Sequence, residues 1–175
     1  MGRIIAVYGV IAGITVAVLM RIAMMLFPEG GTGGMVAGFA SMIVALSFVF
    51  IGIKRYRDIE LGGVIHFWKA LGVGFGIAAI ASLFYVAAWE LYLYFTNYTF
   101  MEEYTRLAIQ QAQKAGKSAA EINALAKEMD GFKNLYAKPL TRMALTLTEI
   151  LPVALLMPIF SATLLRNSKF MPARR

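Results

Sequence analysis

Residues 70 to 95 read ALGVGFGIAAIASLFYVAAWELYLYF, a largely apolar stretch whose one charged residue is Glu90. At about 1.5 Å per residue, a helix of this length crosses the roughly 30 Å of hydrocarbon in a bilayer. A helix is the expected conformation because it pairs all of its own backbone polar groups, which lipid cannot do. The stretch therefore predicts a membrane-spanning helix that contains a carboxylate.

Three other stretches have a similar length and character. They cover residues 4–27, interrupted by Arg21, residues 35–53, which carry no charge, and residues 144–165, interrupted by Glu149. The whole chain of 175 residues is 59% hydrophobic and only 15% charged, with a mean hydropathy of +0.67. A soluble domain of this size has no core large enough for so much apolar surface. We therefore predict an all-α fold, an integral membrane four-helix bundle that forms a single domain.

Residues 96–143 form the one long polar segment, between the third and fourth predicted spans. Thr99 with Glu102, and Ser118 with Glu121, have the spacing of capping boxes, which mark helix starts. The segment therefore predicts two amphipathic helices in an extracytoplasmic hairpin. The hairpin can lie on the bilayer surface or against the bundle, or it can serve as a lid or a partner-docking surface.

The distribution of Lys and Arg predicts the orientation, because basic residues near span ends favour the cytoplasmic side. On one side lie Arg3, Lys54, Arg55, Arg57, Lys69, Arg166, Lys169, Arg174 and Arg175. The other side holds the turn at residues 28–34, whose one charge is Glu29, and the long segment, where basic and acidic residues nearly balance. Both termini are therefore expected in the cytoplasm.

In this orientation, the three charges within the spans lie at one depth. Arg21, Glu90 and Glu149 are each five or six residues from the outer end of their span, which is about 8 Å below the boundary at 1.5 Å per residue. One Arg and two Glu at the same depth can form an intramembrane polar cluster, which lowers the cost of keeping each in lipid. The alternatives are independent snorkelling and a site for a ligand, a lipid headgroup or a proton.

The segment at residues 54–69, KRYRDIELGGVIHFWK, is expected to be a short basic loop. Its Lys54, Arg55 and Arg57 are candidates for contact with anionic lipid headgroups, each worth about 1 kcal/mol near the surface. Plain topological anchoring is the alternative interpretation. Asp58 is expected to cap or pair locally.

Small residues recur at four-residue spacing in three spans, as Gly9 with Gly13, Gly34 with Gly38, and Gly72 with Gly76. Such pairs let helices approach closely, either within the bundle or in a dimer.

Composition also excludes several functions. The chain has no Cys and one His, so disulfides, zinc knuckles and thiol catalysis are excluded. His66 is expected to have an interfacial role. No metal, no cofactor and no enzymatic activity are expected. Nucleic acid is not an expected partner, because the net charge of +7 lies mostly between and beyond the spans.

The segment KRYRD at 54–58, followed by Gly62, Gly63 and VIHFWKALGVG at 64–74, resembles the hallmark of the bacterial membrane-protein family DUF4199, a domain of unknown function. YGVIAG at 8–13 resembles the start of that family. The resemblance implies a four-helix inner-membrane protein and assigns no functional residues.

Two functions therefore stay open. One is a non-enzymatic accessory or interaction protein of the cell envelope, in contact with the lipid bilayer and with a membrane-protein partner or a second copy. The other is a small oligomeric carrier or lipid-handling protein that uses Arg21, Glu90 and Glu149.

Overall fold

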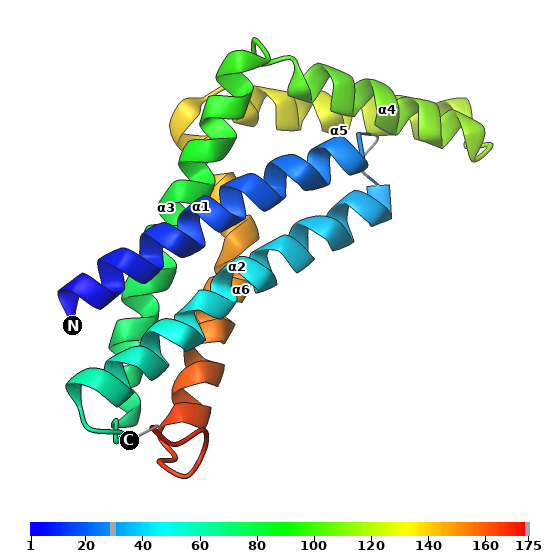
Figure 1. Cartoon of the computed structure of the whole chain (residues 1–175). Coiled ribbons are helices and arrows are strands. Elements are labelled where there is room, and N and C mark those ends of the chain that lie inside the picture. Colours follow the sequence, from blue (N-terminus) through cyan, green and yellow to red (C-terminus); the bar gives the residue numbers. More distant parts are fainter. Residues whose placement is uncertain (29–30, 174–175) are drawn as a thin grey trace. The chain divides into compact units, whose positions relative to one another are not determined.

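The computed structural model describes residues 1–28 and 31–173, so Glu29, Arg174 and Arg175 of the orientation argument lie outside the described residues. The described residues form six α-helices and no strand, which confirms the all-α prediction (Figure 1). The helices are α1 (Gly2–Leu26), α2 (Gly31–Glu60), α3 (Phe67–Phe95), α4 (Phe100–Lys114), α5 (Ala119–Tyr136) and α6 (Pro139–Leu165). The α4–α5 hairpin lies between the third and fourth long helices in chain order, as predicted.

Four of these helices, α1, α2, α3 and α6, are long and apolar enough to cross a membrane, as the sequence predicts. They are longer than the apolar stretches alone. The expected basic loop is wrong in its first half, because α2 continues from Lys54 to Glu60. Lys, Arg and Glu are good helix formers, and hydropathy does not register them as part of a span. Similarly, α6 begins at Pro139 rather than at residue 144, because proline suits the first position of a helix.

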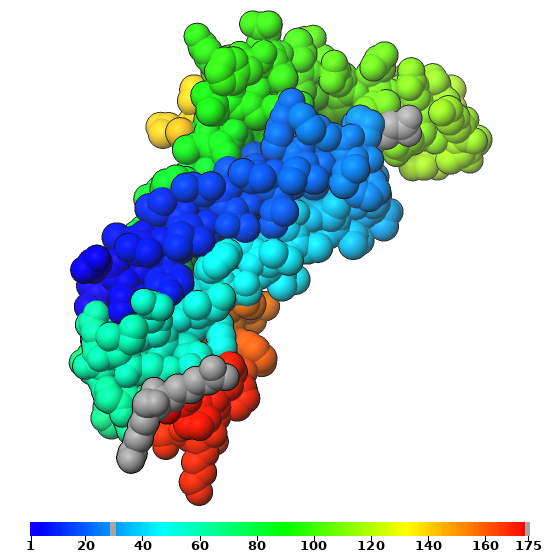
Figure 2. Space-filling model, viewed as in Figure 1, coloured from blue at the N-terminus to red at the C-terminus, as the bar shows by residue number. Residues whose placement is uncertain are grey.

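The chain divides into two compact units, which are described separately. The bundle unit comprises Met1–Ala87 and Leu147–Arg175, and the hairpin unit comprises Ala88–Thr146. In the bundle unit, α1 and α2 run side by side and antiparallel (Figure 1). Its core includes the fully buried side chains of Leu46, Val49, Ile53, Val73 and Ile77. Phe170 contacts the end of α2 through its carbonyl, and Figure 2 shows the red C-terminal surface at the same end of the bundle unit as the turquoise surface near residue 60.

Close helix packing in the bundle unit depends on small residues in α1. A Cβ atom at Gly13 would lie 2.5 Å from Cγ of Phe84, and one at Gly9 would lie 2.7 Å from Cβ of Ile80. Real Cβ atoms do not approach other atoms so closely, so these two glycines allow α1 to contact α3. This is the intramolecular use predicted for them. At Gly38 and Gly72, by contrast, a Cβ would meet nothing within 4 Å.

In the hairpin unit, the second capping box is confirmed and the first is wrong. The Ser118 hydroxyl accepts from the Glu121 amide, and the Glu121 carboxylate accepts from the Ser118 amide at 2.8 Å. Thr99 makes no side-chain cap bond, and its hydroxyl donates instead to the Thr96 carbonyl at 2.9 Å. Thr99 has helical backbone angles (φ −75°, ψ −9°), in which its side chain does not reach the next turn.

Candidate functional site

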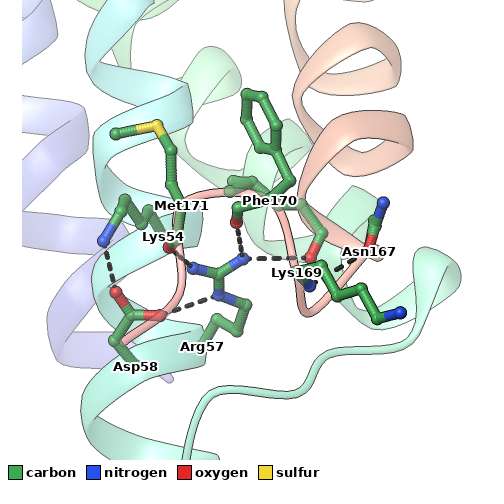
Figure 3. Close-up of polar contacts among 8 residues, drawn as sticks. Lys54, Arg57, Asp58, Asn167, Lys169, Phe170 and Met171 are labelled. Carbon is green, nitrogen blue, oxygen red and sulfur yellow. Dashed lines mark hydrogen bonds and ion pairs between the residues drawn. The ribbon is translucent and has the colours of Figure 1, made fainter. Parts of the chain in front are cut away.

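Arg57, near the end of α2, is fully buried, with 0% exposure. Its Nε donates to a carboxylate oxygen of Asp58 at 2.7 Å. Its Nη1 donates to the carbonyl oxygens of Phe170 at 3.0 Å and Leu165 at 3.4 Å. Its Nη2 donates to the carbonyl of Met171 at 2.5 Å. Figure 3 shows the guanidinium between α2 and the C-terminal segment. We call this arrangement the Arg57 clamp.

The C-terminal segment folds back to meet Arg57 through two local turns. The Phe170 amide donates to the Asn167 carbonyl at 3.0 Å, and the Lys169 amide donates to the Asn167 side chain at 3.0 Å. The Phe170 ring then packs edge-on against Phe50, with ring centroids 6.4 Å apart. The fold-back brings acceptors to Arg57, and the guanidinium also contacts one of the last carbonyls of α6, which have no partner within the helix.

Lys54 completes the ionic part of the clamp. Its Nζ lies 2.5 Å from an Asp58 oxygen, one helical turn away, a spacing at which opposite charges stabilise a helix. Asp58 therefore binds Lys54 and Arg57 together, which confirms the expected local pairing. Arg55 is exposed, whereas Lys54 is half-buried. The predicted contact with anionic lipid stays a prediction, and Arg55 is the exposed member of that set.

The glycines that follow α2 also belong to this end of the bundle unit. Gly62 and Gly63 have φ values of +65° and +97°, a left-handed region that glycine adopts without strain. The Gly63 amide donates to the Arg57 carbonyl at 2.9 Å, which ends the helix. A Cβ at Gly63 would lie 3.5 Å from that of Ala173. The segment that resembles the family hallmark thus builds the contact between α2 and the C-terminal residues.

The hairpin unit contains a second buried arginine, Arg142, in the first turn of α6. Its Nε and Nη2 donate to the two carboxylate oxygens of Glu90 at 2.7 and 2.6 Å, the bidentate geometry that gives strong charge-assisted bonds. The side chains of Arg142 and Glu90 are 7% and 19% exposed. Nη1 also donates to the Tyr136 carbonyl at 3.3 Å. We call this arrangement the hairpin ion pair.

Aromatic rings surround the hairpin ion pair. The Arg142 guanidinium lies 5.0 Å from the ring centroid of Tyr98 and 5.9 Å from that of Tyr136, within range of cation–π attraction. The Trp89 indole donates to the Tyr136 hydroxyl and packs edge-on against Phe100. Tyr98 has φ +59°, which is unusual for a non-glycine residue. The chain therefore accepts backbone strain at the residue that places a ring over Arg142.

The structure gives two of the three predicted intramembrane charges, Glu90 and Glu149, specific partners. Glu90 binds Arg142, which the sequence analysis missed because Arg142 lies outside the apolar stretch. Pro139 could have indicated this pairing, because proline is common at the first position of a helix. A helix that begins at Pro139 includes Arg142 in its first turn. Glu149 accepts a hydrogen bond from the Tyr85 hydroxyl at 2.9 Å. Arg21 is exposed on α1. A single cluster of Arg21, Glu90 and Glu149 stays a prediction.

Within residues 1–28 and 31–173, no group of three or more His, Cys, Asp or Glu side chains is arranged to hold a metal ion. His66 is exposed just before α3, and its carbonyl accepts from the Ala70 amide at 2.9 Å. The candidate polar sites are the two buried arginines, Arg57 and Arg142, and the Tyr85–Glu149 hydrogen bond.

Comparison with known proteins gives one match. A family model described as "Protein of unknown function (DUF4199)" matches residues 7–167. No curated protein and no solved structure matches the chain.

Proposed function

This chain belongs to the DUF4199 family of multi-span helical membrane proteins of unknown function, and from that premise we propose that it is a non-enzymatic accessory protein of the bacterial inner membrane. In this proposal, the α4–α5 hairpin is the part that binds another protein of the cell envelope. The observation that carries the proposal is the hairpin ion pair, Glu90 with Arg142.

A buried ion pair is a poor way to gain stability alone, because desolvation offsets much of the attraction. Its best-attested use is to fix one arrangement of the elements that carry it. Glu90 lies in the last turns of α3 and Arg142 in the first turn of α6, so the pair joins the two chain segments that enter and leave the hairpin. A hairpin that needs a fixed base is expected to present a surface of defined geometry, as a docking element does.

The hairpin surface has the composition of a protein contact. Among the described residues, α5 has none that is buried, and Tyr104, Phe132 and Leu135 are 48%, 37% and 49% exposed. The hairpin also has a shallow groove, lined by Glu102, Thr105, Arg106, Ile109, Gln110, Asp130 and Lys133. Exposed aromatic residues are typical of protein interfaces. Mixed charge in the groove favours a protein partner over an anionic lipid surface.

The non-enzymatic part of the proposal rests on the residue inventory, which contains no Cys and one His. The orientation part rests on the basic residues. Within the bundle unit, the Met1 ammonium lies 2.7 Å from a Glu60 oxygen, and the Arg57 clamp binds the C-terminal segment to the same end of α2. The start of α1, the end of α2 and the C-terminal segment therefore share one basic end, which supports a cytoplasmic location for both termini.

Photocrosslinking in native membranes tests the proposal. A photoreactive amino acid is introduced at Phe132 or Leu135 on the hairpin, and at Leu83 or Leu156 on exposed apolar positions of the spans as matched controls. We expect one stoichiometric protein adduct from the hairpin positions and only lipid adducts from the controls. Phe132→Ser should weaken recovery of that protein, and Leu83→Ser should not. The proposal fails if hairpin and control positions give the same adducts, or if recovery survives loss of the hairpin surface.

The alternative, a small oligomeric carrier, is favoured by one observation. Glu149 is exposed on an apolar helix and has a fixed hydroxyl partner. Uptake or lipid transfer in proteoliposomes that depends on Glu149 would support this alternative over the first proposal.

A further inference from the structure

Glu149 lies in the apolar part of α6, three residues before Pro152. Its side chain is exposed on the surface of the protein. Pro152, one turn further along the same face of α6, is also exposed. In a membrane, the surroundings of this exposed carboxyl are hydrocarbon chains rather than water.

Tyr85 holds one oxygen of this carboxyl in place. The Tyr85 hydroxyl donates to Oε2 of Glu149 at 2.9 Å. The Tyr85 side chain is only 6% exposed, so the hydroxyl is fixed by the core of the bundle unit. A carboxylate has about four acceptor positions, and one phenol hydroxyl is a weak substitute for the water that the membrane removes.

Glu90 and Glu149 differ in the charge of the group that donates to them. Glu90 receives two charge-assisted bonds from Arg142. Glu149 has a neutral donor from α3, and α2 has no charged residue between Gly31 and Ile53. On α6 itself, Arg142 lies seven residues earlier and is bound to Glu90. Arg21, on α1, is the remaining charged group predicted at this depth.

We propose that Glu149 is a proton-binding site, with Tyr85 as its positioning residue. An ionised carboxylate in hydrocarbon is expensive, and protonation removes the charge. The neutral acid keeps its carbonyl oxygen as the acceptor for Tyr85 and gains an O–H group. The ligand of this site is therefore a proton rather than a metal ion, and the site faces the membrane.

Labelling with dicyclohexylcarbodiimide, an apolar carbodiimide, tests this proposal on the full chain in lipid nanodiscs. The acid proton moves to a nitrogen of the reagent while the carboxyl oxygen adds to its central carbon. The resulting O-acylisourea rearranges to a stable N-acylurea, so the protein gains the mass of one reagent molecule. Carboxyls in water are ionised at about pH 7 and react poorly.

We expect one adduct on Glu149 at about pH 7, at least about tenfold above the labelling of Glu90, which is bound by Arg142. Glu149→Gln should abolish the adduct. Raising the pH should reduce labelling, because the reactive form is the acid. In Tyr85→Phe the ionised form loses its donor, so labelling should persist to higher pH.

Two results would overturn the proposal. One is an unlabelled Glu149 in the wild-type protein. The other is labelling that occurs only in Arg21→Gln, which would show that Glu149 is ionised and paired with Arg21. The melting temperature of Glu149→Gln provides an independent measurement. A neutral amide replaces a neutral acid with little change, whereas loss of an ion pair lowers the melting temperature.

Discussion

Arg57 and Arg142 are both buried arginines at the edge of an apolar segment, yet they bind different kinds of partner. Arg57 is fully buried and donates to three backbone carbonyls and to Asp58, its neighbour in sequence. Arg142 donates to both oxygens of one distant side chain, Glu90, and lies against tyrosine rings.

The two contacts depend on different features of the chain. Backbone carbonyls are present whatever the side chains are, so the Arg57 clamp depends on the path of the C-terminal segment. The hairpin ion pair depends on the identity of Glu90. Substitution of the arginine tests both contacts. Substitution of the acceptor side chain removes both bonds of the hairpin ion pair, but at the clamp it removes only the bond to Asp58 and leaves the three bonds to carbonyls.

The largest effect is expected at the Arg57 clamp. Arg57→Ala removes the donor of three backbone carbonyls and leaves Asp58 with Lys54, and it should lower the free energy of unfolding by about 3–5 kcal/mol, the usual cost of breaking a buried charge network. Arg57→Lys retains the charge but lacks the forked donors, and should recover part of the loss. The measurement is denaturant unfolding in mixed micelles. Arg55→Ala, at an exposed neighbour, should change stability by less than about 0.5 kcal/mol, and equal effects at both sites would contradict the clamp.

A smaller effect is expected at the hairpin ion pair. Glu90→Gln replaces two charge-assisted bonds by weaker neutral ones and should cost about 1.5–3 kcal/mol. A double-mutant cycle with Arg142→Gln should give a coupling free energy that accounts for most of this loss. Unchanged thermal stability of Glu90→Gln in detergent would show that the pair does not stabilise the fold.

Helix packing in the bundle unit provides a third test, independent of either arginine. Gly13→Ala places a methyl group against Phe84 and should cost about 1–2 kcal/mol, because overpacking displaces side chains. Gly38→Ala, where the methyl group meets open space, should be neutral or slightly stabilising. Thermal unfolding of the two variants compares them directly. The same melting temperature for both would mean that α1 and α3 are not in close contact at Gly13.

The smallest effect is expected at the start of α5. Hydrogen bonds from the Ser118 hydroxyl and amide lower the pKa of Glu121 below its ordinary value. A lowered folded-state pKa means that this contribution is present above the ordinary glutamate pKa and is lost as pH falls through the lowered value. The protection of the Glu121 amide against hydrogen exchange, relative to an unfolded peptide at the same pH, should therefore fall in acid. Ser118→Ala removes the hydroxyl but keeps the backbone amide, so it should weaken that pH dependence. Thr99→Ala is the control, because Thr99 makes no side-chain cap bond.

The four candidate spans, the hairpin between the last two and the Ser118 cap could all be predicted from the sequence. Each of these follows from local properties. A run of apolar residues long enough to cross a bilayer has few conformations available to it, and Ser118 bonds to a residue three positions away. The predicted end of the second span was wrong for a local reason too. The polar residues from Lys54 to Glu60 extend the helix without adding to its hydropathy.

The partners of the charged residues could not be predicted from the sequence, because they depend on how the chain folds. Arg57 contacts carbonyls more than 100 residues away in the chain, with separations of 108, 113 and 114, and Arg142 contacts a carboxylate 52 residues away. Sequence reasoning placed Glu90 beside residues at the same depth, but a buried charge is neutralised by whichever group the folded chain brings within hydrogen-bonding distance. That group was an arginine outside the apolar stretch. Depth in a membrane constrains which residues can meet, and helix packing selects the ones that do.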